Sequence, residues 1–559
     1  MAKAHKLDEF GGGITAPLRH VTFRRVWLAG LLSNLGVLVR SVGAAWAMTQ
    51  MTSSANMIAL VQTALTLPVM LIAMPAGAIA DMHDRRIVSL ISAGIALAGA
   101  TALTVLTYLD MVTPILLLTL CFVLGTGGAL MDPTWQSSLG EQLPRDAMPA
   151  AVALNGISYN IARSVGPAVG GIVVATAGAV AAFAVNALLY LPLIIALLLW
   201  KRVAQPSRLP REQLSRAVVS GLRYVANSPS IMIVLVRSMV TGIIGAAITA
   251  LMPIVARDLL HGGVQTYGLL LSAFGFGAVI GALYIPETRK RLSGEATIRA
   301  CALSMGVGLF AAALSRDPIL TAAALVLAGA AWMMSWVLLS VGVQLSVPLW
   351  VTGRSLAAYH TAGSGGAAIG SWGWGSLADA AGVEAALLIS AALMLLSPLL
   401  GLWLPMPHVR SRIQEAELLE DVEVQLPLTG RSGPLVVEIE YRIAEENTRA
   451  FHAAMQAVQL FRQRNGAYGW SIACDIADPE TWTERYHCPT WFDYLRQRNR
   501  ATRSERELER KAAAFHIGPH PVRVRRMLER PFGSMSWKED ISERSENEIL
   551  LHESGPGST

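Results

Sequence analysis

The sequence is poor in charged residues. Asp, Glu, Lys and Arg make up only 15% of its 559 residues, while 53% are hydrophobic; a soluble domain carries roughly 25% charged residues. The shortage is confined to residues 25–405, and from Pro407 onward the chain is as polar as a soluble protein. A wholly soluble globular protein is therefore excluded, and the composition predicts a membrane-embedded part followed by a soluble part.

Cysteine is also scarce, and a nucleotide-binding signature is missing. The four cysteines, Cys121, Cys301, Cys474 and Cys488, lack the paired spacing of a metal site, so we expect free thiols in a reducing cytoplasm and no metal. No GxxxxGK followed by Ser or Thr occurs, which argues against direct use of ATP. We expect no cofactor and no nucleic-acid partner.

Twelve apolar stretches occupy residues 25–405, and each has the roughly 20 residues that a helix needs to cross about 30 Å of hydrocarbon. They are residues 25–49, 56–80, 86–108, 113–136, 149–176, 179–200, 230–256, 266–286, 297–315, 318–346, 353–378 and 383–405. A basic segment, 201–229, divides them equally. We expect an all-α membrane protein with two six-helix bundles, 25–200 and 230–405, after an N-terminal segment 1–24.

Basic residues are concentrated in alternate loops, which predicts the orientation. They cluster at Phe23–Arg25, Asp84–Arg86, Lys201–Arg223 and Thr288–Arg291. The intervening loops carry isolated arginines, Arg257 and Arg316. Because basic loops stay in the cytoplasm, we expect both termini there and a multi-pass protein of the inner (plasma) membrane.

The two halves carry related segments, as the parallel repeats of some transporters do. LPRDAMPAAVALN, from Leu143, resembles VPLWVTGRSLAAYH, from Val347. The pentapeptide VLVRS also occurs twice, at a different offset, and we interpret that match as coincidence. Its two arginines are not equivalent: Arg40 lies near mid-membrane and should face inward, whereas Arg237 lies near one end of its stretch and should extend to the inner membrane surface.

The loop between the second and third stretches reads GAIADMHDRR. It resembles the loop signature of the major facilitator superfamily, G-x-L-A-D-R-x-G-R-K. The matching residues are Gly77, Ala80, Asp81, Arg85 and, in place of the final lysine, Arg86. Met82 and Asp84 depart from the signature.

The fifth stretch contains ARSVGPAVGG, which resembles the G-x-x-x-G-P-x-x-G-G motif of exporters in that superfamily. Gly166, Pro167, Gly170 and Gly171 match, and Ala162 replaces the first glycine. Small residues four apart let helices pack closely, and a proline bends a helix. With twelve stretches and a soluble tail, the chain resembles the drug-exporter branch that includes the enterobactin exporter and the transmembrane secretion effectors.

This resemblance implies a secondary active transporter that exports a small organic molecule, a drug or a siderophore-like metabolite, by alternating access. It implies a charge latch of Asp81, Arg85 and Arg86, with Gly77 in the same group, that breaks as the transporter changes face. A solvated charged loop is the plainer interpretation. Asp132, near the inner end of the fourth stretch, is a candidate partner of Arg85.

The resemblance also implies coupling to protons. The sequence supports this only in part, because Cys121 stands where such exporters often carry an arginine, and mid-membrane acids are missing. The nearest candidates for carrying a proton are Asp132 and His360.

Arg40 and Arg163 suggest a positive substrate cavity, with Asn34 and Asn155 nearby, suited to an anionic or catechol-like molecule. The alternative is that both arginines bond to helix carbonyls or amides. Trp336 offers an adaptable apolar wall, although such a residue is more often part of a core.

The soluble part has a pattern of its own after a linker, 406–433. Strands are predicted at 434–443, 467–476, 481–488 and 521–530, with helices at 444–466 and 490–516. This βαββαβ order is that of ferredoxin-like folds, so we expect such a domain over 434–530 and a disordered tail over 531–559. It resembles the dimeric α/β-barrel domain of antibiotic-biosynthesis monooxygenases.

Trp470, His487 and His516 are available for chemistry in that domain, but no catalytic constellation is evident. Apolar residues of its strands, Val436, Val437, Ile439, Trp470 and Ile472, are expected on both sheet faces and predict a homodimer. An exporter with a dimerising or regulatory domain is the first hypothesis. The second is a membrane-anchored enzyme or sensor in which the soluble domain is the active part.

Overall fold

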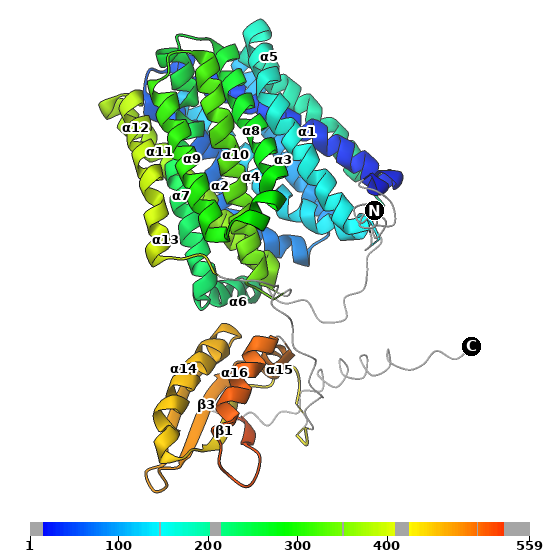
Figure 1. The fold of residues 1–559 in the computed structure, drawn as a ribbon. Coiled ribbons are helices and arrows are strands. Elements are labelled where there is room, and N and C mark those ends of the chain that lie inside the picture. Colours follow the sequence, from blue (N-terminus) through cyan, green and yellow to red (C-terminus); the bar gives the residue numbers. More distant parts are fainter. Residues whose placement is uncertain are drawn as a thin grey trace, which may run out of the picture. The chain divides into compact units, whose positions relative to one another are not determined.

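The computed structural model describes residues 15–144, 147–201, 214–348, 351–407, 424–426, 428–499 and 501–529. The chain divides into a helical unit, made mostly of residues up to 407, and a smaller α+β unit, made mostly of residues from 428 onward (Figure 1). The tail for which we expect disorder lies outside the described residues.

The helical unit contains two groups of long helices. The first group is α1 (Val21–Met51), α2 (Ala55–Met82), α3 (Arg85–Tyr108), α4 (Pro114–Gln142) and α5 (Met148–Leu199). The second group is α7 (Pro229–Ile254), α8 (Val264–Arg291), α9 (Gly294–Leu314), α10 (Pro318–Leu345), α11 (Thr352–Ala381) and α12 (Val383–Leu396). The shorter elements are η1 (Ala16–Arg19), α6 (Leu214–Ala226), η3 (Val255–Leu259), η5 (Ser397–Leu399) and α13 (Leu400–Trp403).

Ten helices in the described part of the chain are long and apolar enough to cross a membrane. One of them, Ala150–Leu199, has 50 residues, about twice the length that one crossing needs. Its helical backbone is interrupted at Gly178, where φ is 78°, a conformation that glycine adopts readily. The polar α11, with 30 residues, is also long enough. The protein is therefore a mostly helical membrane protein with ten to twelve apolar helices.

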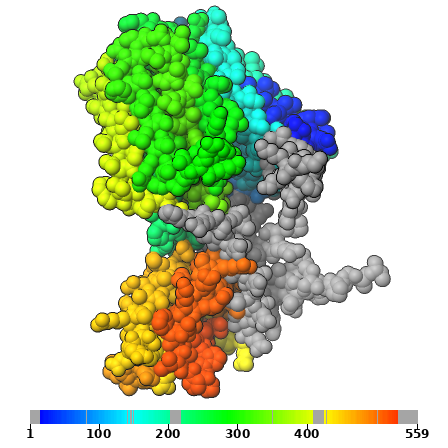
Figure 2. Space-filling model, viewed as in Figure 1, coloured from blue at the N-terminus to red at the C-terminus, as the bar shows by residue number. Residues whose placement is uncertain are grey.

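Contacts between the helices follow two bundles. In the first, α1 packs on α5, and α2 and α3 pack on α4; in the second, α7 packs on α11, and α10 packs on α8 and α9. Two helix pairs form most of the contact between the bundles: α2 with α11, and α5 with α8. On the face drawn in Figure 2, side chains of the second bundle, coloured green to yellow, fill the spaces between its helices.

Glycines permit close approach at both of these contacts. A Cβ atom at Gly375 of α11 would lie 2.6 Å from the Cβ of Ala59 on α2, and one at Gly268 of α8 would lie 3.0 Å from the Cα of Gly171 on α5. Carbon atoms in contact prefer about 3.5–4.0 Å. Larger residues at Gly375 or Gly268 would therefore force the bundles apart.

The α+β unit contains β1 (Leu435–Arg442), η6 (Glu445–Asn447), α14 (Thr448–Arg464), β2 (Tyr468–Cys474), β3 (Thr481–Cys488), α15 (Trp491–Asn499), α16 (Arg503–Ala513) and β4 (Arg523–Leu528). The strands form one antiparallel sheet in the order β2-β3-β1-β4. One face of β1 packs with α14 in an apolar core, formed by Leu435, Val437, Ile439, Tyr441, Phe451, Met455 and Val458 among others. The order of elements agrees with the predicted order.

The helix expected over 490–516 is two helices, and that prediction was wrong in this respect. Thr502 precedes α16 and caps it: its side chain accepts a hydrogen bond from the Glu505 N–H, and the Glu505 carboxylate accepts one from the Thr502 N–H at 2.7 Å. This reciprocal arrangement is a capping box, which starts a new helix.

The distribution of apolar residues on the sheet also differs from the expectation. Val437 and Ile439 lie in the helix-covered core, and Trp470 and Ile472 pack against that core. Side chains alternate along a strand, so the opposite face of β1 carries Val436, Glu438 and Glu440. Register places arginines of β3 and β4 beside these glutamates, at Arg485, Arg523 and Arg525. This face is therefore charged around Glu438 and Glu440, and apolar at Val436, which is 2% exposed and lies opposite Met527 of β4.

Candidate functional site

A cavity of about 180 Å³ lies between the two bundles of the helical unit. It is lined by α2 (Val69, Ala73, Met74, Gly77, Ala78), α4 (Ala129, Asp132, Pro133, Gln136, Ser137), α11 (Gly353, Arg354, Leu356, Ala357, His360) and Val218 of α6. The α2 wall is apolar, whereas α4 and α11 contribute polar and charged groups. Such a mixture, apolar with a few convergent polar groups, is typical of small-molecule sites.

Three charged or titratable side chains line this cavity. The side chain of Asp132 is exposed to it and forms no ion pair with any residue that the structure describes. Arg354 donates a hydrogen bond from Nη1 to the Ser220 hydroxyl at 2.8 Å. The His360 ring lies 5.8 Å from the Trp336 ring and 5.4 Å from the Tyr359 ring. The two candidates for carrying a proton, Asp132 and His360, thus line one cavity from opposite bundles.

The start of α3 is bound to α4 and α5 of the first bundle through two arginines. Arg85 donates from Nη1 to the Ser137 carbonyl at 2.9 Å and to the Glu141 carboxylate at 3.1 Å, both on α4. Arg86 donates to the Leu197 and Leu198 carbonyls at the end of α5, at 2.9 and 2.7 Å. A cation at a helix C-terminus is favourable because it meets the negative end of the helix dipole.

The structure pairs Arg85 with Glu141 and not with Asp132, the partner suggested by the sequence. The two acids are nine residues apart on α4, roughly 13 Å along the helix axis, so one arginine does not reach both. Gly77 lines the cavity with open space beside it. Asp81 lies in the last turn of α2, and its side chain is outside the described part of the structure.

The GPAVGG segment of α5 packs on two helices. Cβ atoms at Gly166 and Gly170 would lie 2.8 Å from the Leu38 Cβ and 3.0 Å from the Val39 Cα, both on α1. A Cβ at Gly171 would instead lie 3.1 Å from the Val264 carbonyl oxygen on α8. The segment therefore packs within its own bundle through two glycines and against the other bundle through the third. Pro167 lies inside the helix between them.

The five residues expected around a substrate lie elsewhere than this cavity. Arg163 lies over the Phe274 ring of α8, 5.1 Å from its centroid, in a cation–π contact between the bundles. Arg40 is buried, and its Nε and Nη1 have no hydrogen-bond partner among the described residues. The buried side-chain oxygen of Asn155 also has no hydrogen-bond partner among the described residues. Trp336 packs behind His360, and Asn34 of α1 is half-buried.

Arg237 is buried in the second bundle, close to the start of α9. Its side chain is 5% exposed and forms an ion pair with Glu295, at the start of α9. Sequence reasoning missed Glu295 because it precedes its apolar stretch by two residues. The available signal was Ser293, which caps α9 and marks Glu295 as a residue of the first turn.

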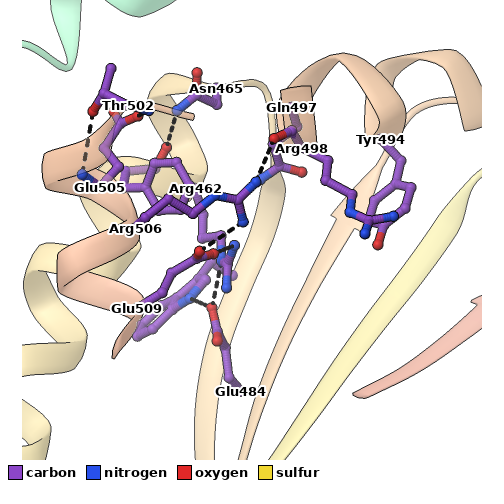
Figure 3. A network of polar contacts seen from close by, with 12 residues as sticks. Arg462, Asn465, Glu484, Tyr494, Gln497, Arg498, Thr502, Glu505, Arg506 and Glu509 are labelled. Atoms are coloured by element: carbon purple, nitrogen blue, oxygen red, sulfur yellow. Dashed lines mark hydrogen bonds and ion pairs between the residues drawn. The ribbon is translucent and has the colours of Figure 1, made fainter. Parts of the chain in front are cut away.

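A buried polar network lies in the α+β unit (Figure 3). Arg462 of α14 donates from Nε to Glu484 of β3 at 3.0 Å and from Nη1 to Glu509 of α16 at 2.6 Å. Trp470 and Tyr441 donate to the two oxygens of Glu484, at 3.0 and 3.3 Å. Burial acts to lower the pKa of Arg462, but the two carboxylates hold it well above its ordinary value.

The other side chains available for chemistry in this unit have structural contacts. The His487 ring stacks on the Tyr468 ring at 5.4 Å, and Nδ1 of His516 accepts a hydrogen bond from the Arg442 N–H at 2.8 Å. Burial raises the pKa of the Cys488 thiol to about 12, so it is unreactive at neutral pH. Within the described ranges, no three His, Cys, Asp or Glu side chains are placed to hold a metal ion.

Comparison with known sequences shows the family. The family described as "Transmembrane secretion effector" matches residues 13–532. The chain belongs to this family. It is a major facilitator superfamily transporter related to drug exporters, and the family and the structural neighbours are transporters and not enzymes.

Individual relatives support this assignment. The "Multidrug efflux pump Tap" of Mycolicibacterium fortuitum is 26% identical over 403 residues, covering 70% of this chain and 96% of the pump. The "Staphyloferrin A transporter" of Staphylococcus aureus is 25% identical over 265 residues, covering 47% of this chain and 66% of that transporter. The helical unit is similar in fold to a mutant of the nucleoside transporter NupG, with a TM-score of 0.58, 13% identity and coverage of 69% of this chain and 100% of that one.

Proposed function

We propose that the protein is a secondary active exporter of a small organic molecule, a drug or a siderophore-like metabolite, working by proton-coupled alternating access. The observation that carries this proposal is the cavity that α2, α4 and α11 line from both bundles. The names of the related multidrug efflux pump and staphyloferrin A transporter support the substrate class. An anchored enzyme or sensor is not favoured, because the relatives are transporters.

The cavity suggests which features a substrate would have. Met74 and its neighbours on α2 offer an adaptable apolar surface, whereas Asp132 and Arg354 offer one group of each charge. A molecule with an apolar body and polar groups of either sign fits this lining. Asp132 is the proposed proton-exchanging group, because it faces the cavity and no described residue forms an ion pair with it.

Several further roles are part of the proposal. Asp81, Arg85 and Arg86 act as a charge latch that changes during the cycle, and Arg40, Arg163, Asn34, Asn155 and Trp336 contribute to the substrate path in another conformation. The basic loops predict that both termini face the cytoplasm, in the inner membrane.

The α+β unit is proposed to be a ferredoxin-like module that forms a homodimer. The strand order β2-β3-β1-β4 with helices on one face supports the fold. On the uncovered face, Glu438 lies 3.8 Å from Arg485 and Glu440 lies 3.9 Å from Arg525, so two copies can place glutamates against arginines. We expect a purified fragment of residues 430–532 to be a dimer in low salt by light scattering; a monomer at tens of micromolar would contradict the proposal.

Transport is tested first in cells and then in vesicles. A deletion strain should become sensitive to, or stop secreting, at least one compound, and everted vesicles that contain the protein should accumulate that compound when a proton gradient is imposed. Deletion of residues 434–559 should leave part of this activity. Complete loss of transport with a folded helical unit would instead favour the α+β unit as the active part, and a strain without any phenotype would count against export.

A further inference from the structure

The first turn of α2 is capped by an acid from the other bundle. Asp379, in the last turn of α11, accepts hydrogen bonds from the Ala55 N–H at 2.5 Å, the Asn56 N–H at 3.1 Å and the Ser54 hydroxyl at 2.7 Å. The first N–H groups of a helix have no partner inside the helix, and they form the positive end of its dipole. A carboxylate that accepts two of these N–H hydrogen bonds and one from a hydroxyl is a strong charge-assisted contact.

The last turn of α1 is held by a base, also from the other bundle. Arg257 of η3 donates from Nη1 to the Thr49 carbonyl at 3.2 Å. Its Nε and Nη2 are bound by the carboxylate of Asp258, at 2.6 and 3.0 Å, which orients the guanidinium. The final carbonyls of a helix form the negative end of its dipole, so this cation is also favourably placed.

The two contacts enclose one turn, residues 52–54, between α1 and α2. A base from the second bundle binds the end of the helix before this turn, and an acid from the same bundle binds the start of the helix after it. Each side chain carries a charge opposite in sign to the dipole charge of the helix end that it binds. Thr63, further along α2, donates to the Ala368 carbonyl of α11 at 3.0 Å, so the contact between α2 and α11 continues inward from the turn.

The same two helices are separated at their opposite ends. There α2 and α11 line the cavity, with Gly77 and Ala78 on one side and Leu356 and His360 on the other. The bundles are therefore in contact at the end with the α1–α2 turn and are separated by the cavity at the other end. In the orientation proposed above, the closed end is the outer one.

We propose that Asp379 and Arg257 form a clasp that closes the outer end of the transporter, and that its release is the step that exposes the cavity to the outside. The inference rests on the alternating-access function proposed above. Removing either charge takes away one or two charge-assisted hydrogen bonds from the closed state only. The ratio of outer-open to outer-closed molecules should then rise roughly five- to thirtyfold, the factor that corresponds to one or two kcal/mol.

Distances between spin labels test the clasp without any substrate. Tyr108, at the end of α3, and Ile319, at the start of α10, are 76% and 77% exposed and belong to different bundles at this end. Both are replaced by labelled cysteines in the full-length protein in nanodiscs, with Cys474→Ser to remove the exposed native thiol. We expect one short distance for the otherwise native chain. An added longer distance is expected for Asp379→Asn and, independently, for Arg257→Gln.

The matched control is Glu384→Gln. Glu384 lies at the same end and bonds to Arg316 at 2.5 Å, but both residues belong to the second bundle. The distances between the spin labels in the Glu384→Gln variant should equal those in the otherwise native chain. Ser54→Ala, which removes one hydrogen bond of the clasp and is a mild change for folding, should shift the distances less than Asp379→Asn in the same direction.

Two outcomes would overturn the clasp. One is unchanged distances in Asp379→Asn and Arg257→Gln, and the other is an equal shift in Glu384→Gln. Because the distances require no transport, this result is separable from the proposed function. A clasp that releases in a protein without export activity would contradict the exporter, whereas export with unaltered distances in the variants would contradict the clasp.

Discussion

Arg237 of α7 and Glu295 of α9 form a two-point ion pair inside the second bundle. Nη1 lies 2.5 Å from one carboxylate oxygen, and Nη2 lies 3.3 Å from the other. Nη1 also donates to the Leu404 carbonyl at 3.0 Å, and the Met406 N–H donates to Glu295 at 3.0 Å. The pair therefore joins α7, α9 and the chain that follows α13, and its role is structural.

Arg237→Lys should destabilise the helical unit by roughly 1–3 kcal/mol, because an ammonium cannot make two parallel contacts to one carboxylate and leaves part of a buried charge without a partner. Thermal unfolding in detergent measures this. Arg299→Lys is the matched control. Arg299 also binds Glu295, at 2.8 Å, but is 39% exposed, so this variant should lower the free energy of unfolding by about 1 kcal/mol or less. Equal effects at the two positions would contradict the structural role.

Arg40 contrasts with Arg237 because its buried Nε and Nη1 have no partner among the described residues. A buried guanidinium with two unpaired nitrogens is costly, which fits a residue that binds its partner at another stage of transport. Arg40→Lys should reduce efflux at least about tenfold, a loss of roughly 1.4 kcal/mol, while membrane insertion stays normal. Efflux from vesicles, normalised to protein amount, measures this, with the exposed Arg316→Lys as control. Native efflux from Arg40→Lys would exclude a role in transport.

Asp132 faces the cavity, and its neutral form is the state that carries a proton. Asp132→Asn should abolish the dependence of efflux on a proton gradient and lower gradient-driven efflux at least about tenfold. The measurement compares everted vesicles with an imposed and with a collapsed gradient. Asp110→Asn is the control, because Asp110 lies in the α3–α4 turn with φ of 55°, which asparagine also adopts. Gradient-driven efflux that persists in Asp132→Asn would show that another group carries the proton.

The membrane helices were predictable because the signal is local. The requirement for about 20 apolar residues acts on each segment separately, and α9, expected over 297–315, is observed at Gly294–Leu314. The interruption between the fifth and sixth stretches falls at Gly178, inside the predicted gap. Capping residues such as Ser54 and Asp317 then determine where the helices begin.

The polar contacts were not predictable in the same way, because they join residues far apart in the chain. Asp379 and Ala55 are 324 residues apart, and nothing in the sequence of either segment indicates that the two are in contact. One signal was present: GSLAD at Gly375–Asp379 repeats the glycine and the Ala-Asp ending of GAIAD at Gly77–Asp81. The similarity of these two segments indicates that Asp379, like Asp81, is an acid at the end of a helix. Only the structure shows what Asp379 binds.

Glu484 is fully buried and accepts hydrogen bonds from Arg462, Trp470 and Tyr441. Glu484→Gln removes the charge that faces Arg462 and replaces one acceptor with a donor. Removing one partner of a buried ion pair costs about 3–5 kcal/mol, and the remaining contact from Arg462 to Glu509 should bring the loss to the lower end of that range.

Urea unfolding of residues 430–532, followed by tryptophan fluorescence, measures the loss. Glu480→Gln is the matched control, because Glu480 pairs with Arg442 at 3.1 Å with both side chains about half exposed, and such surface pairs contribute at most about 1 kcal/mol. The urea concentration at the midpoint of unfolding should fall clearly in Glu484→Gln and hardly at all in Glu480→Gln. If both variants unfold at the same urea concentration, the buried network does not stabilise the sheet, and the helices are held on it by apolar packing alone.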